Sequence, residues 1–344
     1  MSKQYQDELQ SSINLKANEI IKQLPDFAHK YFDHLKTIDR SARTRLQYAY
    51  DLKRFFDFLK EQSGFADIKL SSASANVLDL LSYDDIQEYL NTLNESQYVD
   101  YKGKVHNKKN SSSFKARNIS TLRSFYKFYY KHGEIEKDMA NLMEMPKIKN
   151  VEKFALNQDQ INRLIDAVEQ KPKNKHIYRD KAILTILFLN GIRVSELVGI
   201  DIGDIDFNAG TVVINRKGGD QDLIYLSDLA RDAIITYLEN ERAKDLRNQD
   251  ERALFVSGKN QRISVRMVQD LVSKYSALAG LSNMHVTPHT ARRTYGTYLY
   301  EQTGDIYLVA ETLHHSSIQT TRRYAKMNEN YKKRAKELSD SMLL

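Results

Sequence analysis

The stretch VTPHTARRTYGTYLY, residues 286–300, combines a helix start with two side chains suited to hold an anion. Thr287 followed by Pro288 is typical of an N-cap and the first helical residue. His289 and Arg292 are three residues apart, so a helix places both side chains on one face. A His and an Arg near a helix N-terminus can clamp an oxyanion. Chance spacing on an ordinary helix is the alternative for this stretch taken alone.

A second stretch, NGIRVSEL at residues 190–197, places Arg193 after a glycine turn at the end of an apolar helix. Glu196 follows one helical turn later, where its carboxylate can pair with that arginine. A capped helix start with a local ion pair is the structural interpretation. A cation held ready for an anionic substrate is the functional interpretation.

A β-hairpin is predicted at residues 211–226, TVVINRKGGDQDLIYL, because apolar residues alternate on both sides of Gly218-Gly219. Lys217 lies at the tip of this hairpin, directly after Arg216. The structural interpretation is an exposed turn lysine. The functional interpretation is a mobile cation that a glycine-flanked loop carries to a phosphate.

The fourth stretch is TLHHSSIQTTRRYAK, residues 312–326, which contains His314, His315 and, nine residues after His315, Tyr324. Adjacent histidines point in different directions along a helix, so this pair is a poor basis for a zinc site. Tyr324 is one of 21 tyrosines. A packed surface aromatic is therefore its structural interpretation.

Taken in order, the four stretches resemble the catalytic set of the tyrosine recombinase, or phage integrase, family. Members of this family include the Xer chromosome-dimer resolvases, Cre and lambda integrase. Their set runs Arg, Lys, His-x-x-Arg, His or Trp, and Tyr. The matching residues here are Arg193, Lys217, His289, Arg292, His315 and Tyr324. The resemblance is close over residues 155–330 and more distant over 26–148.

Two positions depart from the family pattern. Ala291 stands where the family usually has Leu, and His314 stands where it usually has Gly. Neither position is catalytic in the family, so we expect altered packing and retained chemistry. The long segment 95–112 and the sequence VTPH are similar to Xer enzymes that act as a single protein and not as a pair.

The resemblance implies roles that suit the chemistry of each side chain. Attack on a phosphodiester puts extra negative charge on the non-bridging oxygens, which the fixed donors of Arg193 and Arg292 can stabilise. His315 adds a donor, and His289 is expected to exchange a proton with the nucleophile. Glu196 is expected to support the arginines and not to carry a proton.

The implied nucleophile is Tyr324, which would form a 3′-phosphotyrosine and release a 5′-hydroxyl. Its ordinary pKa of ~10 makes the phenol a weak nucleophile, and nearby cations reduce that cost. Lys217 is the candidate acid for the leaving oxygen. Because the covalent link stores the energy of the broken bond, no ATP is expected. No metal or other cofactor is expected either.

The expected fold is mainly α with a small β-sheet in the catalytic domain. Residues 1–148 are interpreted as an N-terminal helical core-binding (SAM-like) DNA-binding domain, 149–156 as a linker, and 157–344 as a catalytic domain with a C-terminal helix for protomer contacts. The resemblance implies that the two domains form a C-shaped clamp around a duplex. Residues 95–112 are expected to be a loop, which leaves the N-terminal part all helical.

Composition agrees with a DNA-binding enzyme. The 344 residues carry a net charge of +7, which favours a polyanionic partner. The absence of cysteine excludes disulfides, thiolate zinc sites and cysteine nucleophiles. The first residues have no signal-peptide pattern, and no apolar run approaches the ~18 residues of a membrane span. We therefore expect a cytoplasmic protein without a membrane partner.

The expected partner is double-stranded DNA with inverted half-sites, bound by a homotetramer on two sites, and an accessory activator protein is left open. The biological role is expected to be chromosome dimer resolution or mobile-element integration and excision. Rival interpretations are a type IB topoisomerase-like enzyme and a non-catalytic DNA-binding protein, although the intact catalytic set argues against the latter. The candidate DNA contacts are Arg43, Arg45, Lys115, Arg117, Arg123 and Arg216.

Overall fold

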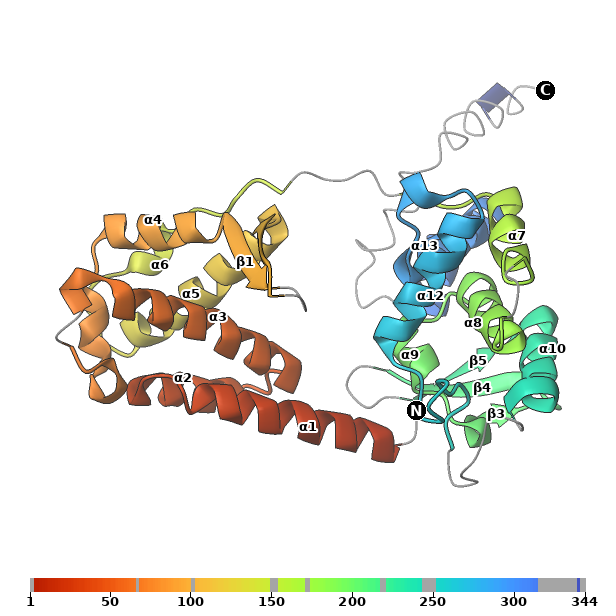
Figure 1. The fold of residues 1–344 in the computed structure, drawn as a ribbon, viewed down its shortest axis with the longest axis horizontal. Coiled ribbons are helices and arrows are strands. Elements are labelled where there is room, and N and C mark those ends of the chain that lie inside the picture. The colour runs from red at the N-terminus through yellow and green to blue at the C-terminus, as the bar shows by residue number, and fades with distance from the viewer. Residues whose placement is uncertain are drawn as a thin grey trace. The chain divides into compact units, whose positions relative to one another are not determined.

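The computed structural model describes residues 3–65, 68–99, 103–148, 154–170, 174–216, 221–242, 252–314 and 339–340. The chain divides into two compact units (Figure 1): residues 7–151, and residues 152–344 together with 1–6. The functions assigned to the two domains and to the linker 149–156 stay predictions. None of the helices in these ranges is long and apolar enough to cross a membrane.

The unit 7–151 is built mainly from helices. Their bounds are α1 (Lys3–Ile21), α2 (Asp26–Thr37), α3 (Ala42–Glu61), α4 (Tyr83–Thr92), α5 (Ser112–Lys131) and α6 (Met139–Leu142), with 3₁₀ turns at Ser63–Phe65, Leu70–Ser72 and Ala75–Leu80. The sequence predicts Ser41 as the N-cap of a helix, and this is confirmed, because its side chain accepts a hydrogen bond from the Thr44 amide at 3.2 Å. Ser82 and Asp85 form a reciprocal capping box at the start of α4.

Aromatic rings fill the centre of this unit. Phe125 on α5 contacts Tyr31 of α2 edge-on at 5.2 Å between ring centroids, and Phe56 of α3 at 5.9 Å. Each of these three rings is at most 1% exposed. Large rings in edge-to-face contact contribute beyond their buried area, and they fix α2, α3 and α5 as one rigid body.

The segment expected to be a loop contains a two-stranded antiparallel ribbon, so the expectation of an all-helical N-terminal part is wrong. Strand β1 (Glu95–Val99) pairs with β2 (Val105–Lys109), with Gln97 opposite Asn107. Most residues of the two strands are polar. None of the side chains described in these strands is buried, and the sequence lacks the alternation of apolar residues by which strands are recognised.

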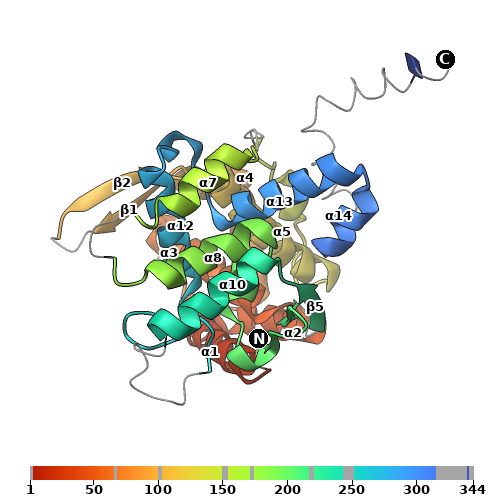
Figure 2. The same ribbon diagram turned by 90° about the vertical axis from the view of Figure 1, so that its right-hand side faces the viewer.

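The second unit surrounds a small sheet with helices. The elements are α7 (Gln158–Asp166), α8 (Ile177–Leu189), α9 (Val194–Val198), a 3₁₀ turn (Ile202–Asp204), β3 (Ile205–Asp206), β4 (Thr211–Asn215), β5 (Gln221–Tyr225), α10 (Asp228–Tyr237), a π turn (Leu238–Arg242), α12 (Val265–Leu278), a 3₁₀ turn (Ser282–Met284), α13 (Pro288–Thr303) and α14 (Ile306–Thr312). Figure 2 shows α8 between α7 and α10. The antiparallel order β3-β4-β5 confirms the hairpin predicted at 211–226.

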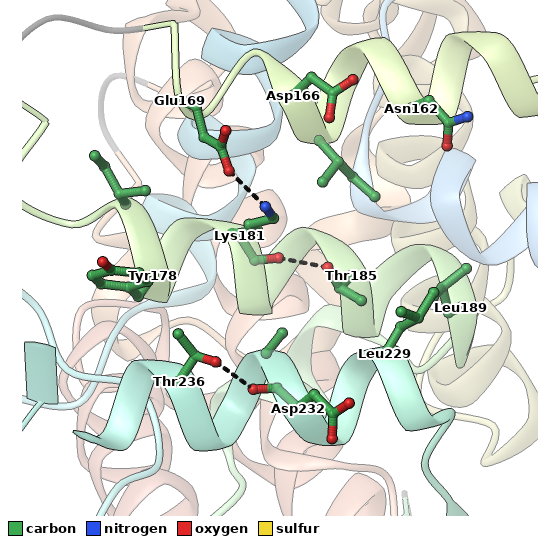
Figure 3. Close-up of a pocket in the computed structure, with 13 residues that line it drawn as sticks. Asn162, Asp166, Glu169, Tyr178, Lys181, Thr185, Leu189, Leu229, Asp232 and Thr236 are labelled. Atoms are coloured by element: carbon green, nitrogen blue, oxygen red, sulfur yellow. Dashed lines mark hydrogen bonds and ion pairs between the residues drawn. The ribbon is translucent and has the colours of Figure 1, made fainter. Parts of the chain in front are cut away.

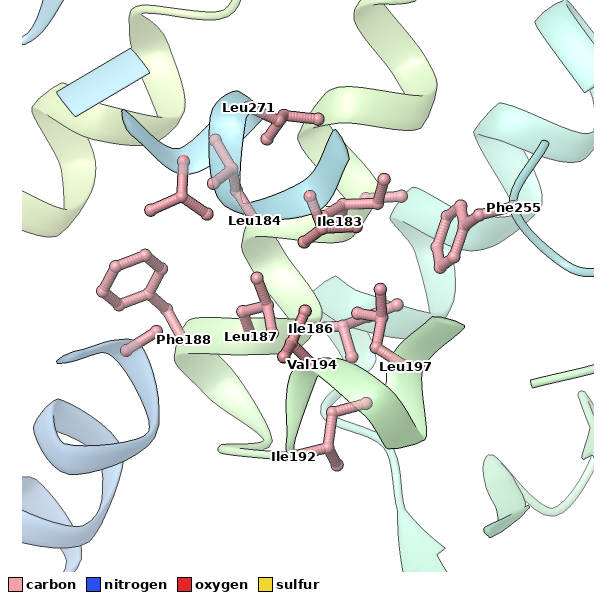
Figure 4. Close-up of a cluster of buried hydrophobic side chains, with 14 of the residues drawn as sticks. Ile183, Leu184, Ile186, Leu187, Phe188, Ile192, Val194, Leu197, Phe255 and Leu271 are labelled. Atoms are coloured by element: carbon pink, nitrogen blue, oxygen red, sulfur yellow. The ribbon is translucent and has the colours of Figure 1, made fainter. Parts of the chain in front are cut away.

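Helix α8 is the centre of this unit, and nearly all of its residues from 182 to 188 are buried (Figure 4). Ile183, Leu184 and Leu187 have no exposed surface. A helix that is apolar on every side must be covered on every side. Helices α7, α10, α12 and α13 supply that cover.

One expectation for this unit needs correction. The sequence pattern predicts one helix over about 228–243, but this stretch is α-helical only to Tyr237 and continues as a π turn to Arg242. In that turn Glu241 is buried and accepts hydrogen bonds from the amides of Tyr178 and Arg179 at the start of α8. The apolar stretch 253–257 predicts either a short strand or a buried turn, and the structure has a buried segment with isolated bridges in place of a strand.

Candidate active site

The end of α8 is shaped by a glycine. Gly191 has φ +58°, in the left-handed region, and a Cβ at this position would collide with the ring of Tyr295 on α13. Glycine is therefore required both by the backbone angle and by the lack of space. Its carbonyl oxygen accepts a hydrogen bond from Arg292 Nη1 at 2.8 Å, so the close approach brings α13 to the start of α9.

Arg193 and Glu196 form the local ion pair that the sequence predicted. The Arg193 amide donates to Glu196 Oε2 at 2.8 Å, and Arg193 Nη1 donates to Oε1 at 2.7 Å. Glu196 is 4% exposed, whereas the Arg193 side chain is 35% exposed. A buried carboxylate thus holds a guanidinium that still reaches the surface. The structural and functional interpretations of this pair are compatible.

The β4–β5 hairpin adds a second arginine to Glu196. Arg216 is 8% exposed, and its Nη1 donates to Glu196 Oε1 at 3.0 Å. Its Nη2 donates to Asp222 Oδ2 at 2.6 Å. Arg216 therefore has two buried or half-buried carboxylate partners, and its predicted contact with DNA stays a prediction. The sequence did not predict Asp222 as a residue of the site.

Helix α13 begins as predicted. The Thr287 side chain accepts from the Thr290 amide at 3.2 Å, and Pro288 is the first helical residue. His289 is exposed, one turn before Arg292, which is only 7% exposed. Besides its bond to Gly191, Arg292 donates through Nη2 to the carbonyl of Leu313 at the end of α14.

His314 follows α14 with φ +45°, and its carbonyl accepts from Arg193 Nη2 at 3.2 Å. Its Nε2 contacts Asp222 Oδ2. Burial of the imidazole, followed by the charge of Arg216, lowers the pKa of His314, and these effects outweigh the opposite influence of the Asp222 carboxylate. The imidazole is therefore neutral at neutral pH. The altered packing expected at this position takes the form of a contact with the hairpin.

These contacts bring three arginines and two carboxylates into one cluster, which we call the arginine cluster: Arg193, Glu196, Arg216, Asp222 and Arg292. Three positive and two negative groups leave one positive charge with His314 neutral. Such a cluster attracts an anion and has donors already fixed in place. Lys217, His315 and Tyr324 lie outside the described residues, but Lys217 follows Arg216 and His315 follows His314 in the chain.

The candidate DNA contacts of the first unit are partly occupied by the protein. Arg117 donates to Asp51 from Nε at 3.2 Å and from Nη2 at 3.1 Å, and Asp51 is 1% exposed. Lys115 donates to Asn94 at 2.9 Å. The remaining assignments are Arg45, which donates to Asn14 at 2.8 Å, Arg43, which is exposed, and Arg123, which is half-buried.

The sequence interpretation did not single out Arg54, which contacts the same aromatic ring as Arg117. Both guanidinium carbons lie 5.0 Å from the centroid of the Phe114 ring, a cation–π arrangement. The two side chains are 43% and 39% exposed. The spacing to Asp51, three residues before Arg54 on α3, was the available signal.

A groove of about 400 Å³ lies between α7, α8 and α10, away from the arginine cluster (Figure 3). A Lys181–Glu169 ion pair of 2.6 Å crosses it. None of the described candidate catalytic residues lines this groove. Its lining consists of Asn162, Ile165, Asp166, Glu169, Ile177, Tyr178, Lys181, Thr185, Leu189, Leu229, Asp232, Ala233 and Thr236.

Comparison with known proteins gives consistent matches. The model of the phage integrase family matches residues 155–331. A protein named tyrosine recombinase XerC from Caldanaerobacter subterraneus subsp. tengcongensis is 31% identical over 317 residues, which span 89% of this chain and 84% of that protein. One named tyrosine recombinase XerD from Oceanobacillus iheyensis is 30% identical over 279 residues, 80% of this chain and 93% of that protein.

The fold has solved counterparts. The XerH site-specific recombinase, in a crystal structure bound to palindromic difH substrate as a post-cleavage complex, aligns with a TM-score of 0.63. The alignment covers 95% of this chain and 94% of that one at 17% identity. At this identity the likeness concerns the fold alone, and it confirms the predicted class of a mainly helical chain with a small sheet.

Proposed function

This chain belongs to the phage integrase family of DNA strand-breaking and rejoining enzymes, and we propose that Arg193 and Arg292 hold the scissile phosphate in its active site. The observation that carries the proposal is their convergence on one short segment. Arg193 donates to the carbonyl of His314, and Arg292 donates to that of Leu313. Two guanidinium groups from separate helices thus meet directly before the stretch that leads to Tyr324.

The remaining donors of these arginines suit a phosphate that gains charge. In the transition state the non-bridging oxygens carry more negative charge than in the ground state, so fixed cations lower the barrier. Glu196 keeps Arg193 in one orientation through two hydrogen bonds. In the proposal His289 and His315 are the further donors to the same phosphate, and His289 exchanges the proton of the attacking phenol.

Tyr324 is the proposed nucleophile. Its phenolate oxygen forms a bond to phosphorus, the bond from phosphorus to the 5′ oxygen breaks, and Lys217 gives that oxygen a proton. The product is a 3′-phosphotyrosine and a free 5′-hydroxyl. Attack by a 5′-hydroxyl on the phosphotyrosine reverses the step, so rejoining requires no ATP. The proposed chemistry uses side-chain cations and takes no metal or other cofactor.

The proposed substrate is double-stranded DNA that carries two inverted half-sites. Exchange of two duplexes requires four cleavages, so four copies of the chain would act on two sites, with or without an accessory activator protein. Relatives of this chain bear the names XerC and XerD. We accordingly propose chromosome dimer resolution, or integration and excision of a mobile element, as the biological role, with the cytoplasm as its location.

One experiment tests the reaction and separates it from its rivals. The protein is incubated in EDTA with supercoiled plasmids that carry pairs of candidate sites, and the products are analysed for covalent adducts and recombinants. We expect both from the wild-type chain and neither from Tyr324→Phe, which should still bind the site because only one hydroxyl is removed. Relaxation without recombination would indicate a topoisomerase, and binding without adducts would indicate a non-catalytic protein.

A further inference from the structure

The side chains around Glu196 form a closed ring of contacts. Glu196 Oε1 accepts from Arg193 Nη1 at 2.7 Å and from Arg216 Nη1 at 3.0 Å. Arg216 Nη2 donates to Asp222 at 2.6 Å, and Asp222 contacts the imidazole of His314. The ring closes where the His314 carbonyl accepts from Arg193 Nη2 at 3.2 Å. Three parts of the chain that are far apart in sequence are joined: the start of α9, the β4–β5 hairpin and the end of α14.

This ring holds the base of the connection between β4 and β5. The last paired residues of the two strands are Asn215 and Gln221. Arg216 and Asp222 lie on either side of residues 217–220, and the ion pair between them spans the hairpin at that level. Because Glu196 and His314 bind the two members of the pair, both ends of the connection that contains Lys217 are fixed relative to Arg193.

His314 is held in a backbone conformation that its side chain disfavours. A φ of +45° is common for glycine but costs energy for a residue with a Cβ. Such residues persist when their surroundings determine their conformation. Here the imidazole is held by Asp222 and the main-chain carbonyl by Arg193. The strained residue is therefore attached to the ring through both its side chain and its backbone.

We propose that His314 and Asp222 are positioning residues of the cleavage reaction, and that their contact sets where the connection containing Lys217 begins. Neither residue touches the DNA in this proposal. It rests on the proposed function, in which Lys217 donates a proton to the 5′ oxygen. Loss of the contact leaves Arg193 and Arg292 able to hold the phosphate, and it displaces the acid.

The test compares two substrates under single-turnover conditions with saturating protein, on a duplex carrying the site found in the plasmid assay. One has an ordinary phosphodiester at the scissile position, and the other has a 5′-bridging sulfur, which leaves without a proton. We expect His314→Gly and Asp222→Ala each to slow cleavage of the ordinary substrate about tenfold or more, and the sulfur substrate less than about threefold. The double variant should be about as slow as Asp222→Ala, because the contact with Asp222 that His314→Gly removes is already lost in Asp222→Ala, which also removes the ion pair with Arg216.

A matched control is available in His285. This exposed histidine also has a left-handed backbone, φ +48°, but it has no part in the ring. His285→Gly should cleave both substrates within about twofold of wild type. His314→Asn keeps a donor and tolerates a left-handed backbone, so it should recover part of the rate lost in His314→Gly.

Several results would overturn the proposal. They are an unchanged rate on the ordinary substrate, equal slowing on both substrates, and loss of folding or DNA binding in both His314 variants, measured by thermal unfolding and mobility shift. Equal slowing would mean that the contact does not act through the acid. Failure of the proposed function itself is distinguishable, because the wild-type chain would then form no covalent adduct.

Discussion

Arg193, the residue directly before α9, and Arg292 on α13 donate hydrogen bonds to consecutive main-chain carbonyls, those of His314 and Leu313. A guanidinium carries five donors in a fixed plane, so each arginine can hold a carbonyl with one nitrogen and keep others for a phosphate. The residues that follow α14 are thereby hydrogen-bonded to both arginines of the proposed phosphate site. For binding of the phosphate in the proposed site, the orientation of the two guanidinium groups therefore matters more than their charge alone.

The first prediction follows from that geometry. In Arg292→Lys the charge remains, but a single ammonium cannot replace the bonds to Gly191 and Leu313 and also bind a phosphate. We expect the rate of covalent adduct formation to fall about 10²–10³-fold, the usual cost of losing one such donor, with site binding nearly unchanged. Denaturing gels of protein–DNA adducts measure the rate, and mobility shifts measure the binding.

Arg293→Lys is the matched control for this change. Arg293 is the next residue of α13, is half-buried and donates to the Phe154 carbonyl at 3.2 Å. It should retain cleavage near the wild-type rate. If Arg292→Lys cleaved as fast as this control, charge alone would suffice and the argument from geometry would be wrong.

Local sequence signals predicted the elements that carry the candidate site. The caps at Ser41 and Thr287, the glycine turn at Gly191 and the hairpin flanking 217–220 all act within a few residues, so short-range patterns determine them. The ribbon at 95–109 was missed because most of its strand residues are polar and show no apolar alternation. Patterning predicts burial, and it fails where a strand is stabilised by pairing alone.

The ring of contacts shows where sequence reasoning stops. Asp222 belongs to no motif, and His314 was noted only as part of a poor zinc pair and as a departure from a glycine. The two residues are 92 positions apart (314 minus 222), and their contact depends on how α14 packs beside the sheet. Only the resemblance to a family assembled the candidate catalytic residues in order. The distances among the arginines and Glu196 required the folded chain.

A second prediction concerns the proposed acid. Lys217→Ala should slow cleavage of ordinary DNA by about 10²-fold or more, and should slow cleavage of 5′-bridging phosphorothiolate DNA far less. The reason is that the sulfur leaving group does not require a proton. Lys259→Ala, which removes another lysine of the same unit from an exposed position, is the control. Equal slowing on both substrates would exclude Lys217 as the acid.

The third prediction uses the titration of His314. Burial and the charges of Arg216 and Arg292 lower the pKa of His314, against the influence of Asp222 and Glu196. The unfolded chain, with a histidine pKa of about 6.5, therefore binds the proton more readily than the folded chain. The stabilisation of the folded protein by neutral His314 is therefore fully present above the pKa of histidine in the unfolded chain. It is lost as the pH falls through the lower pKa of His314 in the folded chain.

The measurement is the melting temperature at two pH values. Between about pH 7.5 and about pH 5.5 we expect Tm of the wild-type protein to fall a few degrees more than Tm of His314→Asn, because asparagine does not titrate. All other titrating groups are common to both proteins. His285→Asn should behave as wild type. A larger fall in His314→Asn than in wild type would reverse the sign and contradict the direction of the pKa shift.

The last prediction concerns coupling between protomers. Exchange of two duplexes requires four cleavages, so the proposed four protomers must act together. Residues 328–344, NENYKKRAKELSDSMLL, lie outside the described part of the chain except for Ser339 and Asp340, and they predict a helix with late apolar positions at Leu338, Met342 and Leu343. A short helix gains little stability by itself and needs a surface to pack against. The family resemblance implies that this surface belongs to an adjacent protomer, and packing on its own domain is the alternative.

Deletion of 329–344 should leave single-site binding largely intact and reduce both cooperative filling of paired sites and recombination. Leu343→Ser should act in the same direction, and Lys333→Ser, which keeps the apolar positions, should not. A truncated protein that recombines at the normal rate would exclude the helix from coupling. A truncated protein that fails to fold would support packing of the helix on its own domain.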